Sequence, residues 1–150
     1  MFDIDQLFTI VQAAIREFAA SHPDKTFYAF AIDADMLCLN SEENFAESLV
    51  KYQANYPDDY DDEDNIQELK HNTGDWHYQG FFDLEDEHGF DADAYSDHYG
   101  EAGDSDDGTA PHTPYAKAMS ALIAKLQGSD VFEPLKRTDD FRISWVDHSY

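Results

Sequence analysis

The apolar positions near the amino terminus repeat first with the period of a helix and then with that of a buried strand. Between residues 4 and 18, apolar residues recur every three or four positions: Ile4, Leu7, Phe8, Val11, Ala14, Ile15 and Phe18. One face of a helix brings such positions together, so we predict an amphipathic helix over residues 5–20. Residues 26–32 are apolar at nearly every position and rich in aromatic side chains. This is typical of a central strand covered on both faces.

A short turn at residues 33–35 leads into a second apolar run at residues 36–39, and the two runs together predict a β-hairpin. A second helix is expected to begin at Asn40 or Ser41, whose side chains can cap free amide hydrogens, and to end before Pro57. Its predicted buried face consists of residues at helical spacing: Phe45, Leu49, Tyr52 and Tyr56.

The middle of the chain predicts two shorter elements and then an irregular segment. A short helix around Ile66 and Leu69 is expected to end in a cap at residues 72–74. Residues 76–82 are expected to form an aromatic strand. Residues 83–108 consist mainly of acids, glycine, histidine and tyrosine with neither period, which predicts a loop.

Regular structure is expected again after the irregular segment. A Thr–Pro pair at residues 113–114 begins a third amphipathic helix that ends at Gly128. Residues 141–146 alternate like a strand with one solvent face. This order of elements favours an α+β fold with a small, mainly antiparallel sheet packed with three or four helices. We predict one domain over residues 1–150, with a long acidic loop segment at residues 83–112.

Acidic residues are concentrated in the middle of the chain. The 150 residues include 33 Asp and Glu against 9 Lys and Arg, a formal net charge of −24. Residues 58–107 hold 19 of the acids and a single base, Lys70, and therefore carry 18 of the 24 net negative charges. This balance argues against direct binding to nucleic acid or to an anionic membrane, because both depend on Lys and Arg. With 42% hydrophobic and 15% aromatic residues, the chain should still fold around a core.

The sequence favours a cytoplasmic location. Cys38 is the only cysteine, so no internal disulfide can form, and we interpret it as a buried thiol. Acids stand near the amino terminus where a signal peptide carries bases, and no apolar run reaches the length of a membrane span.

Several stretches of the chain match the pattern of a known family. Residues 27–32 follow an amphipathic helix and lead through a turn into the helix start at residues 40–43, and residues 72–76 lead into another strand. With the aromatic strand near the end, they resemble a bacterial family catalogued as domain of unknown function 4303. The resemblance covers most of the chain outside residues 83–108. It implies a place among bacterial toxin–immunity pairs and carries over no catalytic residue.

The candidate catalytic and metal-binding motifs fail on their spacing. No glycine of the acidic segment occupies the sixth position of an EF-hand loop that has the required oxygen ligands. Residues 104–109 superficially match a phosphatase signature, but Ser105 stands where the nucleophilic Asp is needed. His71, His77 and His88 have no compact metal-ligand spacing. We therefore predict no catalytic residues, no metal ligands and no cofactor. Loose binding of divalent cations by the carboxylates stays open.

Tyrosines interleaved with the acids suggest a surface of flat anchors surrounded by negative charge, which suits docking of a basic protein. The predicted partner-binding residues are Asp58, Asp59, Tyr60, Asp61, Asp62, Glu63, Asp64, Asp91, Asp93, Tyr95, Asp97, Tyr99, Asp104, Asp106 and Asp107. Our hypothesis is a non-enzymatic immunity protein that neutralises a cognate basic toxin, such as a nuclease, by covering its active cleft. The alternatives are a DNA-mimic protein and an unrecognised enzyme or divalent-metal-binding protein.

The excess of negative charge predicts that salt stabilises the folded protein. Like charges repel one another more strongly in the compact state than in the unfolded chain, and added salt screens that repulsion. We expect the melting temperature to rise between low and moderate ionic strength, as followed by circular dichroism. A melting temperature that does not change with salt would mean that the acids are compensated locally.

Overall fold

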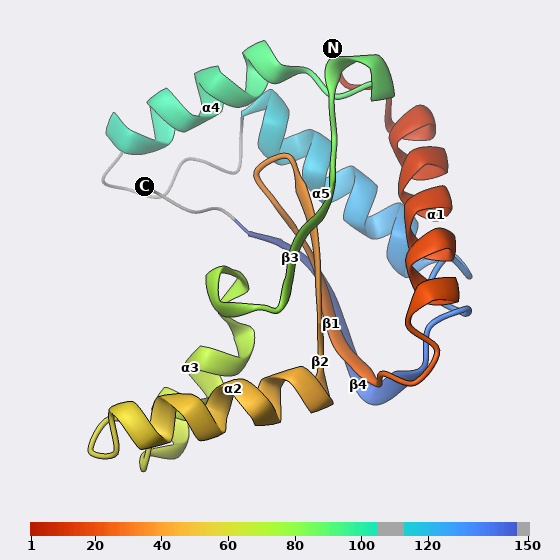
Figure 1. The fold of residues 1–150 in the computed structure, drawn as a ribbon. Coiled ribbons are helices and arrows are strands. Elements are labelled where there is room, and N and C mark those ends of the chain that lie inside the picture. The colour runs from red at the N-terminus through yellow and green to blue at the C-terminus, as the bar shows by residue number, and fades with distance from the viewer. Residues whose placement is uncertain (105–112, 147–150) are drawn as a thin grey trace.

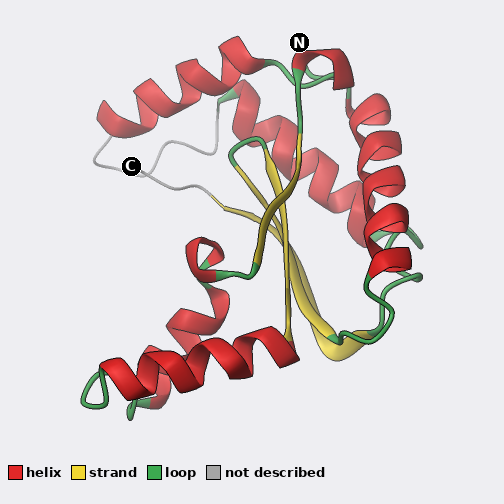
Figure 2. Ribbon diagram, viewed as in Figure 1, coloured by secondary structure: helices red, strands yellow, loops and turns green. Residues whose placement is uncertain are grey.

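A four-stranded sheet forms the centre of the protein in the computed structural model, which describes residues 1–104 and 113–146 (Figure 1). The elements are α1 (Ile4–Ser21), β1 (Phe27–Asp33), β2 (Met36–Ser41), α2 (Glu42–Asn55), α3 (Glu63–His71), η1 (Thr73–Asp75), β3 (Tyr78–Asp83), η2 (Asp86–His88), α4 (Ala92–Asp104), α5 (Pro114–Gln127) and β4 (Arg137–Val146). The strand order is β3-β2-β1-β4, with β1 parallel to β4 and the other two pairings antiparallel (Figure 2). This confirms the predicted α+β fold with a mainly antiparallel sheet.

The central strand β1 is the most completely buried element, as its sequence predicts. All seven of its residues are buried, and it lies between β2 and β4. The predicted hairpin is also confirmed, because Asp33 pairs with Met36 across the turn between β1 and β2. Ala34 makes this tight turn with a positive φ of 58°.

Helices α1 and α5 lie along one face of the sheet (Figure 1). Their buried side chains join one core cluster with apolar residues of β1 and β2, among them Phe30, Ile32, Leu37 and Leu39. Helix α5 begins as predicted, with Thr113 as its cap: the Thr113 hydroxyl accepts a hydrogen bond from the Ala116 amide at 3.1 Å. Each helix in the described part of the chain is too short or too polar to cross a lipid bilayer.

The opposite face of the sheet carries a smaller apolar cluster. It contains Tyr28, Ala29, Ala31, Cys38 and Trp76, and Phe45 from the start of α2 packs against it. The expected burial of Cys38 is confirmed, and burial raises the pKa of its thiol to about 12. This cluster attaches the start of α2 to the sheet, and its Tyr28 and Trp76 side chains donate hydrogen bonds to the Lys70 carbonyl of α3.

The predicted buried face of α2 is only partly covered. Phe45, Leu49 and Tyr52 are half-buried, whereas Tyr56, at the carboxyl cap, is 53% exposed, and Asn44 is the fully buried residue of this helix. The start of α2 contacts the sheet, and the rest extends outward beside α3 (Figure 1). The periodicity correctly indicated a helix, but the short helix α3 is too small to cover it. We call α2, the connecting residues 56–62 and α3 the α2–α3 arm.

The acidic loop predicted at residues 83–112 contains more regular structure than expected. It includes η2 and the helix α4, whose first amides are capped by Asp91: its carboxylate accepts a hydrogen bond from the Ala94 amide at 3.0 Å. The inward-facing residues of α4 in the described chain include Tyr95 and His98. They are not a series of aliphatic residues at helical spacing, so the hydrophobic pattern of the sequence shows no helical period here. Residues 105–112 lie outside the described part of the chain.

Candidate functional site

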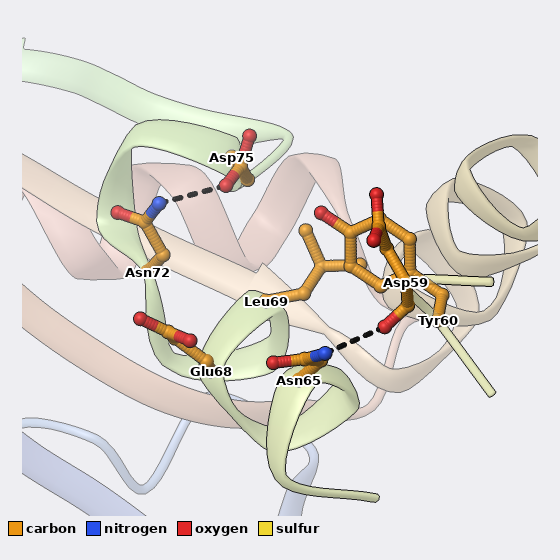
Figure 3. Close-up of a pocket in the computed structure, with 7 residues that line it drawn as sticks. All are labelled: Asp59, Tyr60, Asn65, Glu68, Leu69, Asn72 and Asp75. Atoms are coloured by element: carbon orange, nitrogen blue, oxygen red, sulfur yellow. Dashed lines mark hydrogen bonds between the residues drawn. The ribbon is translucent and has the colours of Figure 1, made fainter. Parts of the chain in front are cut away.

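A pocket of about 420 Å³ opens in the α2–α3 arm and is the best candidate for a functional site. It lies between the connecting segment, α3 and η1 (Figure 3). Its lining combines three carboxylates, two amides, one aromatic ring and one aliphatic side chain: Asp59, Tyr60, Asn65, Glu68, Leu69, Asn72 and Asp75.

Helix α3 supplies one wall of the pocket by its periodicity. Asn65, Glu68 and Leu69 are spaced by three and four residues, so they lie on one face of the helix, and Asn72 continues the series at its cap. Leu69 is only 5% exposed and forms the apolar floor of this wall. The opposite side comes from the connecting segment, whose Tyr60 ring lies beside Leu69 (Figure 3).

Hydrogen bonds from both helices hold the connecting segment in place. The Asn65 side-chain amide donates to the backbone carbonyl of Asp59 at 2.7 Å (Figure 3), and the Gln53 amide donates to the carbonyl of Tyr60 at 3.0 Å. The Tyr60 ring centroid also lies 5.2 Å from that of Tyr52. The position of the Asp59 and Tyr60 backbone is therefore fixed by side chains of α2 and α3.

Asp75 is held by donors on both of its carboxylate oxygens. The Tyr52 hydroxyl donates to Oδ1 at 2.8 Å, and the Asn72 amide donates to Oδ2 at 2.8 Å (Figure 3). The hydrogen bond to this carboxylate and its negative charge raise the pKa of Tyr52, because both disfavour the phenolate. The Asp75 carboxylate is thus held in one position at the edge of the pocket.

No Lys or Arg of the described residues forms an ion pair with a carboxylate of the pocket. Among the described residues, the ion pairs of Lys and Arg join Lys70 to Glu42, Lys125 to Asp5 and Arg137 to Glu133, and none involves a pocket carboxylate. Lys70 belongs to α3 but turns away from the pocket: its ammonium lies 3.2 Å from Glu42 and 4.8 Å from the Tyr28 ring centroid. The pocket therefore offers three carboxylates to a cation from outside.

The arrangement suits binding of an organic cation better than it suits a metal ion. Within residues 1–104 and 113–146, no three His, Cys, Asp or Glu side chains are grouped so that they could hold a metal. An aromatic ring and an apolar floor beside carboxylates can instead receive the alkyl part of a Lys or Arg side chain together with its charge.

The structure separates the predicted partner-binding residues into two groups. Asp59 and Tyr60 line the pocket, Asp62 caps α3 through a hydrogen bond from the Asp64 amide at 2.9 Å, and Asp58, Asp61 and Glu63 are exposed beside them. The second group belongs to α4 and its start, at the other end of the molecule (Figure 1). It comprises Asp91, Asp93, Tyr95, Asp97, Tyr99 and Asp104, while Asp106 and Asp107 lie outside the described residues.

Within the second group, two residues serve the fold. The Asp91 carboxylate caps α4 and pairs with the amino-terminal ammonium at 2.6 Å. The Tyr95 ring is half-buried and lies 4.9 Å, centroid to centroid, from that of Tyr115. The side chains of Asp93 and Asp97 are exposed, whereas those of residues 99–104 are outside the description.

Sequence reasoning missed the pocket residues that come from α3 and η1. One face of α3 and its cap brings together four of them: Asn65, Glu68, Leu69 and Asn72. Their spacing is visible in the sequence, but one buried leucine among polar residues is also typical of an ordinary surface helix, so the spacing does not indicate a pocket. Asp75 belongs to residues 72–76, which the sequence marks only as a stretch that leads into a strand. Its place beside Tyr52 depends on tertiary packing.

Comparison with known families gives one match. A family model described as Domain of unknown function (DUF4303) matches residues 7–149 and confirms the resemblance inferred from the sequence. Comparisons with curated proteins and with solved structures found no match.

The raised pKa of Tyr52 should depend on Asp75. In Asp75→Asn the acceptor is neutral, so the phenolate is no longer opposed by a carboxylate and the pKa of Tyr52 should fall toward its ordinary value. An NMR pH titration of the tyrosine ring carbons measures this shift. Asp93→Asn, on α4, should leave the pKa of Tyr52 unchanged; equal titration of Tyr52 in the wild type and in Asp75→Asn would contradict the hydrogen bond.

Proposed function

Since this chain belongs to the DUF4303 family, whose description states no activity, we propose a function from its own surface: it is a non-enzymatic protein that binds a basic protein partner. The observation that carries the proposal is that Asp59, Glu68 and Asp75 all line one open pocket, with no Lys or Arg of the described chain paired to them. The partner would supply the missing positive charge.

Binding would proceed in two steps that use different parts of the arm. The net charge of −24, with exposed acids at residues 58–64 next to the pocket, would attract a positively charged surface and speed its encounter. A Lys or Arg side chain of the partner would then enter the pocket, with its alkyl part against Tyr60 and Leu69. Its charged end would form charge-assisted hydrogen bonds with the carboxylates.

Within this proposal the partner is a toxin whose active cleft is basic, as the cleft of a nuclease must be to hold the phosphate backbone. Covering such a cleft with the α2–α3 arm would block the substrate without any chemistry by the binding protein. The protein would then act as an immunity protein in the bacterial cytoplasm.

Removing the pocket charges should weaken binding more than removing charges elsewhere. The triple variant Asp59→Asn, Glu68→Gln, Asp75→Asn should bind a hexa-arginine peptide about tenfold more weakly than the wild type, because charge-assisted hydrogen bonds are lost. A matched control, Glu17→Gln, Asp24→Asn, Asp130→Asn, changes exposed acids outside both groups of predicted partner-binding residues and gives the same net charge. Its affinity should change by less than about threefold. Fluorescence anisotropy measures both; equal losses would indicate bulk attraction without a site.

The biological partner should be the protein encoded next to this chain. We expect the two to co-purify, with an association rate that falls steeply as salt rises, because steering is screened. Protection against a single toxin is the expected result. Competition with duplex DNA for several unrelated DNA-binding proteins would indicate a DNA mimic instead, and a salt-insensitive association rate would contradict steering.

A further inference from the structure

The side chains that line the pocket offer a ligand mainly hydrogen-bond acceptors. Both amides of the lining direct their nitrogen at the protein (Figure 3). Asn65 donates to the Asp59 carbonyl at 2.7 Å, and Asn72 donates to the Asp75 carboxylate at 2.8 Å. By contrast, no described donor forms a hydrogen bond with the side-chain oxygens of Asp59, Asn65 or Glu68. A ligand that fits must therefore be rich in donors and poor in acceptors.

The acceptors come from three separate elements, so they border the pocket on different sides. Asp59 belongs to the connecting residues 56–62, Asn65 and Glu68 to α3, and Asp75 to η1. A Lys ammonium has its three donors on a single nitrogen atom, whereas an Arg guanidinium has five donors on three nitrogens in a planar fork. The guanidinium can therefore reach acceptors on several sides of the pocket at once.

The ring of Tyr60 favours the same cation. It is half-buried and lies beside the apolar floor formed by Leu69 (Figure 3). Its position is held by the Gln53 amide, which donates to the Tyr60 carbonyl at 3.0 Å, and by the ring of Tyr52, 5.2 Å away between centroids. A planar, weakly hydrated guanidinium stacks on such a ring better than a strongly hydrated ammonium does.

We propose that the pocket is selective for arginine: the guanidinium of one Arg of the basic partner stacks on Tyr60 and donates to Glu68 and to the side-chain oxygen of Asn65. The Glu68 side chain is exposed and can accept two parallel N–H bonds from one guanidinium, a geometry that an ammonium does not provide. Asp59 and Asp75 add negative charge from the other sides. This inference rests on the proposed function and names the basic side chain that the pocket takes.

The test compares two peptides of equal charge, hexa-arginine and hexa-lysine, by fluorescence anisotropy. We expect the wild type to bind hexa-arginine on the order of tenfold more tightly than hexa-lysine, because only the arginine peptide gains the stacking and the bidentate hydrogen bonds. Glu68→Gln and Tyr60→Leu should each reduce this ratio by about threefold, since each removes one source of the preference.

Two control variants change the same residue types outside the pocket. Glu17→Gln neutralises an exposed acid of α1, and Tyr56→Leu removes an exposed ring at the carboxyl cap of α2. Both should keep the wild-type ratio. Circular dichroism verifies that the four variants are folded, and because Glu68 is exposed, Glu68→Gln tests the inference even if Tyr60→Leu does not fold.

The possible outcomes separate this inference from the proposed function. Equal affinity of the wild type for the two peptides, or an arginine preference that survives unchanged in Glu68→Gln and Tyr60→Leu, would overturn arginine selectivity and leave the proposed function standing. If the wild type binds neither peptide, the proposed function fails with it. N-acetylarginine amide supplies a guanidinium without a peptide and should bind far more weakly than hexa-arginine; equal affinity would overturn a protein as the source of the guanidinium.

Discussion

Burial of β1 on both of its faces is the constraint that organises the structure. A strand whose seven residues are all buried needs cover on two sides, and one side is provided by α1 and α5. On the other side, Tyr28 of β1 and Trp76 both donate hydrogen bonds to the Lys70 carbonyl, at 2.6 and 2.8 Å. These bonds satisfy a carbonyl at the end of α3 and fix that helix to the sheet. The pocket face of α3 is therefore positioned by the core.

The distribution of charge follows from the same constraint. Asp33 is the only buried carboxylate among the residues whose burial the structure describes, and it accepts a hydrogen bond from the Thr73 hydroxyl at 2.7 Å. The other acids of the described chain lie where water can solvate them, and many of them lie on the α2–α3 arm, which contributes little to the core. The fold can thus tolerate a high negative charge because its stability comes from elements that carry little of it. The same separation leaves the acids of the arm available to a partner.

The sequence predicted the elements whose burial is dictated by their own residues. β1 has a continuous apolar run, and α5 has both a regular stripe and a Thr–Pro start, so each was recognised. Helix α4 was missed because tyrosine, histidine and alanine face inward instead of aliphatic residues. The predicted buried face of α2 is only half-buried for another reason: a helical period shows that one side of a helix is apolar but not how fully another element covers it. Asp59 and Tyr60 were selected by composition, whereas Asp75 joined the site only through packing.

The incomplete cover of α2 and the charge of the arm belong together. An arm held to the sheet at one end cannot bury the outer side of its longer helix, so Val50 stays in water. Attraction between charges acts over a Debye length of about 8–10 Å and raises the rate of encounter, but at exposed positions it contributes little to the lifetime of a complex. Apolar surface contributes nothing at a distance and becomes favourable only when water is removed on contact. On the proposal that the arm binds a basic partner, its acids would therefore set the rate of encounter, whereas apolar contacts would set how long the complex lasts.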